Sequence, residues 1–231
     1  MNKSAVGVYH CAMNKLANSV YQWADYGATM PAIDEPVLQT GPIRDVHLHD
    51  ERAMVLRVQA GDQQAFGELV RKYMQRAYYG ALGLTGSHDD ALELSQEAFA
   101  RAFRARDSID PERPFYTWYY QILRRLCFNL GRDESSRRRK LQEQGSWLIA
   151  EAEQRQSPGP ETTLQQQQLQ IRCQQAIESL PDAEREMIVL RELQGLGYQE
   201  IAGLLDIPIG TVMSRLYSAR KRLATHLAEL K

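Results

Sequence analysis

The spacing of apolar residues limits this chain to helical structures. Where the pattern is clearest, Phe66, Leu69, Val70 and Tyr73 fall at positions i, i+3, i+4 and i+7, which places all four on one face of a helix. The sequence shows no strict alternation of apolar and polar residues of the kind that marks a β-strand. Amphipathic helices bury their apolar faces by packing against one another. The sequence therefore predicts an all-α fold.

Changes in composition divide the chain into four segments. Residues 1–52 mix aromatic residues, Gly and Pro without sustained periodicity, which predicts a poorly ordered arm with a short helix at 12–24. This arm is either a partner-binding segment or a dispensable tail. Residues 53–130 carry helical periodicity, whereas residues 131–162 are rich in charge and contain a Ser-Pro-Gly-Pro run typical of a linker. Residues 163–231 are helical again, so we expect two small helical domains joined by a flexible linker.

Breaker residues set the expected helix boundaries within the first of these domains. A helix should end near Arg106, before a loop that Pro111 and Pro114 enforce, because each proline disfavours helix in the residue before it. The next helix should run over residues 115–130, with Gly131 as its stop.

The C-terminal segment has the pattern of a helix-turn-helix. A short helix expected at 198–205 is followed by Asp206-Ile207-Pro208, where Asp tolerates a left-handed turn and Pro fits the first turn of the next helix. That second helix has an apolar stripe made of Val212, Leu216, Ala219, Leu223 and Leu227. By helical geometry its opposite face presents Gly210, Ser214, Tyr217, Ser218 and Lys221, which we expect to be free to meet a groove.

Charge is distributed unevenly in a chain that is nearly neutral as a whole. The formal net charge is −1, so no global basic field points to a nucleic acid. No acidic residue lies between Asp206 and Glu229, however, and the same stretch holds Arg215, Arg220, Lys221 and Arg222. Phosphate attraction beside small residues at a helix start is typical of a DNA-recognition helix. The alternative is an ordinary helix pair with a solvated basic face.

No pattern in the sequence indicates catalysis, a metal site or a cofactor. Cys11, Cys127 and Cys173 stand far apart, without a Cys-x-x-Cys pair or a His at ligand spacing. The histidines have no nucleophile or carboxylate at motif spacing, and there is no glycine-rich phosphate loop. We find no apolar run suited to a signal peptide or to a membrane span of roughly 20 residues. We therefore expect a non-enzymatic protein that works in the cytoplasm.

Two parts of the chain resemble the sigma-70 family of bacterial RNA polymerase subunits, and in particular its extracytoplasmic-function (ECF) members. Residues 180–227 resemble the family's fourth conserved region, notably Tyr198-Gln199-Glu200-Ile201-Ala202 and Gly210-Thr211-Val212-Met213-Ser214-Arg215-Leu216. Residues 90–103 resemble the second-region helix that binds core polymerase, with Glu93-Leu94-Ser95-Gln96-Glu97-Ala98-Phe99. The run Phe115-Tyr116-Thr117-Trp118-Tyr119-Tyr120-Gln121-Ile122 resembles the part that opens and reads the −10 promoter element.

This resemblance implies a sigma factor, which directs core polymerase to promoters, and it implies three sets of site residues. The −35 duplex would be bound by Thr211, Met213, Ser214, Arg215, Tyr217, Ser218, Arg220 and Lys221. The −10 element would be opened and read by Tyr116, Trp118, Tyr119, Tyr120, Arg124 and Arg125. Some of the four aromatic residues must instead belong to the core, because they point around the whole helix. Core polymerase would be bound by Asp90, Glu93, Leu94, Gln96 and Glu97. The resemblance also admits an anti-sigma factor as a further partner.

The aromatic and basic residues around α-helical positions 115–140 suit an opened DNA strand, and two rival functions remain. Stacking of unpaired bases on aromatic side chains contributes about 1–3 kcal/mol per base, which offsets part of the free-energy cost of separating the strands. Residues 124–140 hold seven basic and two acidic residues, so this stretch can follow phosphates. One rival is a stand-alone activator or repressor, which would bind duplex DNA tightly without polymerase. The other is a scaffold that acts through residues 1–52 and does not need Arg215 or Lys221.

Overall fold

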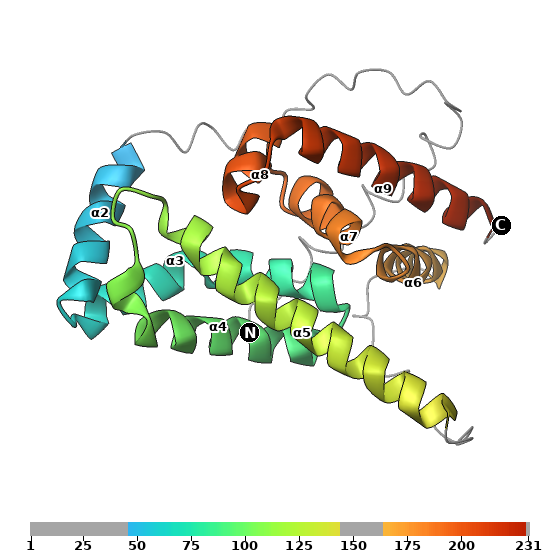
Figure 1. Ribbon diagram of the computed structural model, residues 1–231, viewed down its shortest axis with the longest axis horizontal. Coiled ribbons are helices and arrows are strands. Elements are labelled where there is room, and N and C mark those ends of the chain that lie inside the picture. The colour runs from blue at the N-terminus through green and yellow to red at the C-terminus, as the bar shows by residue number, and fades with distance from the viewer. Residues whose placement is uncertain (1–45, 144–163, 230–231) are drawn as a thin grey trace.

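The computed structural model describes residues 46–143 and 164–229 (Figure 1). Within these ranges the chain is helical and contains no strand, which confirms the predicted all-α class. The helix expected at 12–24 and most of the expected linker lie outside the described residues. The boundary expected at residue 53 is wrong, because the first described helix begins at Val46 and Glu51 within it is buried. The elements are α2 (Val46–Gln59), α3 (Gln63–Thr85), α4 (His88–Arg104), η1 (Arg106–Ser108), α5 (Phe115–Glu143), α6 (Leu164–Glu178), α7 (Asp182–Ile188), η2 (Val189–Leu193), α8 (Tyr198–Leu205) and α9 (Ile209–Glu229).

Helices α2 to α5 form an N-terminal group whose boundaries follow from local caps. Asp62 caps α3 by accepting hydrogen bonds from the backbone N–H groups of Gln64 and Ala65, at 2.9 and 3.1 Å. The bond from Ala65 and the ion pair with Arg57 hold the pKa of Asp62 below its usual value. Gly86 ends α3 in the left-handed conformation, at φ 74°. These residues satisfy backbone groups that helix ends otherwise leave unpaired.

Helix α5 extends past its expected end. It continues to Glu143, so the expectation of a stop at Gly131 and of a linker beginning there is wrong. Glycine ends a helix when it takes up a left-handed conformation, and Gly131 is not among the glycines with positive φ. An exposed glycine inside a helix costs about 1 kcal/mol relative to Ala, which its neighbours can offset.

Helices α6 to α9 form a C-terminal group with its own apolar centre. Met187 and Ile188 of α7 are fully buried, as are Leu216 and Leu223 of α9, and α7 lies alongside α9 (Figure 1). A π-helical turn, η2, follows α7 directly, and Gly195 then ends the helical run at φ 73°.

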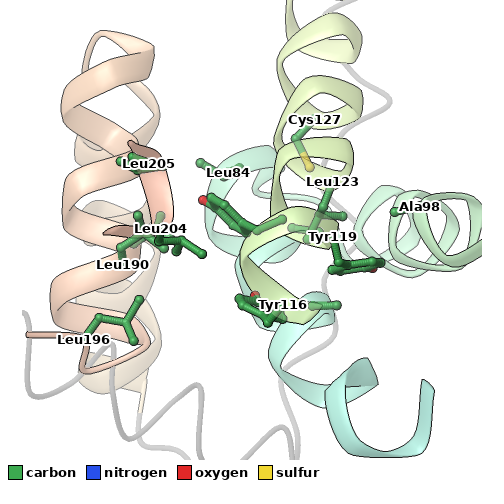
Figure 2. Packing of buried hydrophobic residues seen from close by; sticks show 14 of the residues in the cluster. Leu84, Ala98, Tyr116, Tyr119, Leu123, Cys127, Leu190, Leu196, Leu204 and Leu205 are labelled. Atoms are coloured by element: carbon green, nitrogen blue, oxygen red, sulfur yellow. The ribbon is translucent and has the colours of Figure 1, made fainter. Parts of the chain in front are cut away.

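The two groups pack directly against each other. Helices α3 and α5 meet α7, η2 and α8, and the buried apolar residues of both groups form one continuous cluster. Figure 2 shows Leu190 and Leu204 of the C-terminal group on the side that faces Leu84 and Tyr116 of the N-terminal group. Gly83 permits the close approach, because a Cβ at this position would lie 2.8 Å from both terminal methyl carbons of the buried Val189.

We predict that Gly83→Ala lowers the free energy of unfolding by about 1–3 kcal/mol, because the added methyl group overpacks the contact with Val189. Gly203→Ala on α8 is the matched control. Nothing lies near its added Cβ, so we expect a gain of about 0.5–1 kcal/mol. Urea unfolding followed by circular dichroism measures both variants. Equal stability of Gly83→Ala and the parent chain would contradict the close packing.

Candidate nucleic-acid interface

The outer face of α9 is exposed as its sequence pattern predicts. Val212, Leu216, Ala219 and Leu223 point inward and are at most 1% exposed. On the opposite face, Gly210, Ser214, Tyr217 and Lys221 are exposed and Ser218 is half-buried. Met213 and Tyr217 expose 53% and 46% of their surface. Both side chains lie in the first three turns of the second helix of a helix-turn-helix, the part of such a helix that contacts base edges.

The turn before α9 holds this face in place. The side chain of Glu200 accepts a hydrogen bond from the backbone N–H of Gly197 at 2.7 Å, which secures the start of α8. Asp206 then takes up the left-handed conformation at φ 55°, in agreement with its expected role in the turn. The backbone N–H of Ile207 donates to the carbonyl of Ala202 at 3.1 Å, which closes the turn. Because α8 and α9 are fixed to each other in this way, the face of α9 has a defined orientation.

Arg220 does not lie on the exposed face, and its assignment to DNA phosphates is wrong for this structure. Its side chain is buried and donates to a carboxylate oxygen of Glu192, from Nη2 at 2.7 Å and from Nε at 3.2 Å. Nη1 also donates to the hydroxyl of Tyr198 at 3.4 Å. This bonding joins α9 to η2 and α8. Arg220 therefore stabilises the helix-turn-helix from within.

The positive charge of the exposed face is smaller than the sequence suggests. Arg222 also has an internal partner, since its Nε lies 3.0 Å from a carboxylate oxygen of Glu184. Among the described residues, Arg215 and Lys221 form no ion pair. Of the four basic residues between Asp206 and Glu229, only these two are therefore available to contact phosphates.

The polymerase-contact set on α4 is only partly exposed. Glu93 and Gln96 are exposed, while Asp90 and Leu94 are half-buried. Glu97 is engaged within the helix, since it accepts hydrogen bonds from Arg101 at 2.7 Å and from Arg104 at 3.4 Å. The hydrogen bond from Arg101 is the main reason that the pKa of Glu97 lies below its usual value. Within this set, the acidic residues for which no ion pair is seen are therefore Asp90 and Glu93, of which Glu93 is the exposed one.

Three of the four aromatic residues expected to stack on bases belong to the core, which corrects the prediction. Tyr116, Tyr119 and Tyr120 are at most 3% exposed. The ring of Tyr119 stacks on Phe99 at 4.2 Å between centroids, and its hydroxyl donates to the carbonyl of Ser95. Trp118 is half-buried. It is therefore the aromatic residue of this set that retains an accessible surface.

The two arginines of the −10 set have different environments. Arg125 is exposed. Arg124 forms a two-pronged ion pair with Glu186, with Nε 2.7 Å from one carboxylate oxygen and Nη2 2.6 Å from the other. The hydroxyl of Tyr120 donates to the same carboxylate at 3.1 Å. One end of this cluster lies on α5 and the other on α7, so it bridges the two helical groups.

Glu186 lies at the centre of this cluster, and the sequence pattern did not indicate its role. Its carboxylate is fully buried. A carboxylate in such a site needs charged or hydrogen-bonding partners, because loss of hydration is costly. In the sequence, Glu186 is an ordinary acidic residue of an amphipathic helix. Its partners lie more than 60 positions earlier, so local spacing carries no signal for the pairing.

The described residues contain no cluster suited to a metal ion, and their two cysteines are buried. No group of three or more His, Cys, Asp or Glu residues in this part of the chain could hold a metal ion. Burial raises the pKa of the Cys127 thiol to about 12 and that of Cys173 to about 11, so both thiols keep their protons at neutral pH. None of the described helices is long and apolar enough to cross a membrane.

Comparison with known proteins finds the same family in both halves of the chain. A family model described as sigma-70 region 2 matches residues 69–137, and one described as sigma-70, region 4 matches residues 171–223. The ECF RNA polymerase sigma-E factor of Escherichia coli K12 is 36% identical over 180 residues, which cover 75% of this chain and 92% of the relative. That of Haemophilus influenzae is 33% identical over 187 residues, covering 78% and 96% respectively.

Two solved structures have a similar fold. CnrH, in complex with the cytosolic domain of CnrY, is 23% identical with a TM-score of 0.57, over 78% of this chain and 97% of CnrH. The sigma factor RpoE of Bartonella quintana, in complex with the anti-sigma factor NepR, is 26% identical with a TM-score of 0.53. That match covers 71% of this chain and 96% of RpoE.

The different environments of two adjacent basic residues lead to a prediction about α9. Arg220→Leu should lower the free energy of unfolding by about 3 kcal/mol or more, because Glu192 loses its buried partner. Lys221→Ala should change stability by no more than about 0.5 kcal/mol. It should instead lower affinity for duplex DNA and reduce the slope of log affinity against log salt by about 1.

Thermal unfolding and salt-dependent DNA binding separate the two effects. The inverse result, with a stable Arg220→Leu and an unstable Lys221→Ala, would contradict the assignment of these side chains to the core and to the DNA face.

Proposed function

Because this chain belongs to the ECF sigma factors of the sigma-70 family, we propose which of its residues carry each step of promoter recognition. The protein directs core RNA polymerase to particular promoters, and its region 4 binds the −35 element. Sigma factors as a family are not enzymes, and we infer that phosphodiester synthesis belongs to the polymerase. The chain then works in the cytoplasm, where the polymerase lies.

For the −35 element, the proposed contacts are those on the exposed face of α9. Ser214 and Ser218 are small, and Met213 and Tyr217 are exposed, so this surface can approach base edges in the major groove. Thr211, Arg215 and Lys221 flank it and supply phosphate or sugar contacts. The main support for this assignment is that α9 exposes this face while its apolar stripe is buried.

For the −10 element, the proposed contacts centre on α5. Trp118 is the stacking surface for an unpaired base, and Arg125 is exposed for phosphate contact. Arg124 can join them only when Glu186 releases it, because its guanidinium donates to the Glu186 carboxylate in this structure. For core polymerase, the proposed contacts are Glu93 and Gln96 on the exposed face of α4, with Asp90, Leu94 and Glu97 beside them.

We infer that the described arrangement is a closed form of the sigma factor. The Glu186 carboxylate binds the guanidinium of Arg124, as a DNA phosphate would. Gln121 also donates to the backbone carbonyl of Leu204 at 2.8 Å. Part of α5 is thus covered by the domain that binds −35 DNA. Binding of α5 to a promoter requires the two groups to separate. Core polymerase would offset the free-energy cost of that separation by binding each group.

We propose an anti-sigma factor as a further partner. The solved sigma factor RpoE, which is 26% identical to this chain, is in complex with the anti-sigma factor NepR. A protein that binds the closed form more tightly than the open form would shift the chain away from promoters.

The function is tested by transcription with the full chain and core polymerase. We expect initiation at a subset of promoters in a genomic library, and transcripts identical to those of core polymerase alone would contradict the function. A stand-alone activator or repressor would instead bind duplex promoter DNA tightly without polymerase.

The −35 assignment predicts the effect of one added charge. Ser214→Glu should lower affinity for a −35 duplex by about tenfold or more, because a carboxylate would face the phosphates and base edges. Thr225→Glu, at an exposed position farther along α9, is the control and should change affinity by less than about threefold. Binding to core polymerase should stay unchanged in both variants. Equal loss of DNA and polymerase binding in Ser214→Glu would overturn the division of labour.

The closed form predicts that loss of one charge opens the molecule. Glu186→Gln should increase the radius of gyration in X-ray scattering and raise the affinity of the free chain for promoter DNA by about tenfold, because Arg124 loses its buried counter-charge. Glu184→Gln is the control, since Glu184 lies on the same helix but pairs within its own group. A Glu186→Gln chain as compact as Glu184→Gln would show that this pair does not hold the two groups together.

A further inference from the structure

Glu51 on α2 is a buried carboxylate with three donors. Its side chain is 6% exposed. One oxygen accepts a hydrogen bond from the backbone N–H of Phe115 at 2.6 Å. The other accepts from Lys72 Nζ at 2.5 Å and from the hydroxyl of Tyr73. Burial, and then the neighbouring Glu51, raise the pKa of Tyr73, which keeps the proton on its hydroxyl and preserves this bond. The residue lies upstream of the region 2 match, which begins at residue 69.

The bond to Phe115 fixes the start of α5. The first N–H groups of a helix have no partner within the helix, and here the acceptor comes from a residue 64 positions earlier in the chain. A negative charge at this end also interacts favourably with the helix dipole. Phe115 is fully buried, so water cannot replace the carboxylate as its partner.

Two other side chains of α2 secure the segment that leads into α5. Gln59 donates to the backbone carbonyl of Ile109 at 2.8 Å. Arg52 pairs with Glu112 at 2.8 Å, at an exposed position. Helix α2 therefore holds the approach to α5 at three points, of which the contact through Glu51 is the buried and charged one.

The first turn of α5 carries Trp118. This residue follows Phe115 by three positions, and the two rings lie 6.1 Å apart between centroids. The ring of Phe115 also lies 5.8 Å from that of Tyr73, which itself donates to Glu51. A change in the position of Phe115 would therefore be passed to Trp118 through one helical turn and through direct ring contact.

We propose that Glu51 is a positioning residue for promoter opening, which fixes the first turn of α5 so that Trp118 meets the first unpaired base of the −10 element. This proposal rests on the assignment of Trp118 to the −10 element made above. Glu51 itself touches no DNA. Its carboxylate acts through Phe115, and its effect should appear in strand opening rather than in −35 or polymerase binding.

The test measures opening by the full chain with core polymerase. The template is a promoter fragment found active in the library transcription, with 2-aminopurine in the −10 element. It is used as a duplex and with the −10 bases mismatched so that they are already unpaired. The variants are Glu51→Ala, Glu51→Gln and Trp118→Ala. Glu112→Gln, at the exposed end of the Arg52 pair, is the matched control.

We expect Glu51→Ala to slow opening of the duplex by about tenfold or more, since a buried hydrogen bond to a charged acceptor is lost. Glu51→Gln retains an acceptor for Phe115 and should be slowed less. Glu112→Gln should stay within about twofold of the parent chain. On the mismatched template Glu51→Ala should recover to within about threefold, because little strand separation remains to be driven. The affinities for core polymerase and for a −35 duplex should stay unchanged.

Several outcomes would overturn the proposal, and they are distinct from failure of the −10 assignment. If Glu51→Ala is slowed equally on both templates, or loses affinity for core polymerase and the −35 duplex, Glu51 serves general stability only. If both Glu51 variants fail to fold, the conclusion is the same. If Glu51→Ala opens the duplex normally while Trp118→Ala does not, the positioning role fails and the −10 assignment stands. Normal opening by Trp118→Ala would refute the −10 assignment itself.

Discussion

The ion pair between Arg124 and Glu186 is the interaction on which the arrangement of the two helical groups depends. A fully buried carboxylate is costly unless both oxygens have partners, and the guanidinium of Arg124 supplies one to each. Because the acid lies in region 4 and the base in region 2, neutralising the charge and packing the two regions are the same event. Gly83 allows the backbones to come close enough for it.

If α5 binds the −10 element as proposed, Arg124 on its surface has two alternative partners. Arg124 is bound to Glu186 in the proposed closed form, whereas a promoter would offer phosphates to the same side chain. The exposed face of α9 has no such conflict, because Arg220 pairs inside its own domain and leaves Ser214, Tyr217 and Lys221 at the surface. The two proposed DNA-binding surfaces therefore differ in how exposed they are in this structure.

The sequence predicted helices better than it predicted which side chains they expose. The face of α9 was predicted correctly, because this helix packs along a single side and its apolar stripe marks that side. Helix α5 is different, because α3, α4 and α8 surround it, so residues around most of its first turns are buried. Tyr116, Tyr119 and Tyr120 therefore belong to the core. Likewise, Arg220 is of a residue type that often binds phosphate, but it is buried and paired with Glu192.

The sequence by itself determined the helical class, the helix-turn-helix, the family and the exposed face of its second helix. These features depend on spacing within a few turns, which local periodicity records. Only the tertiary structure decided the partners of the buried Glu51 and Glu186. The hydrogen bond from Phe115 to Glu51 and the ion pair of Arg124 with Glu186 each join groups more than 60 positions apart along the chain. Whether a charged side chain meets solvent or a counter-charge depends on what packs over it, and a linear pattern does not contain that information.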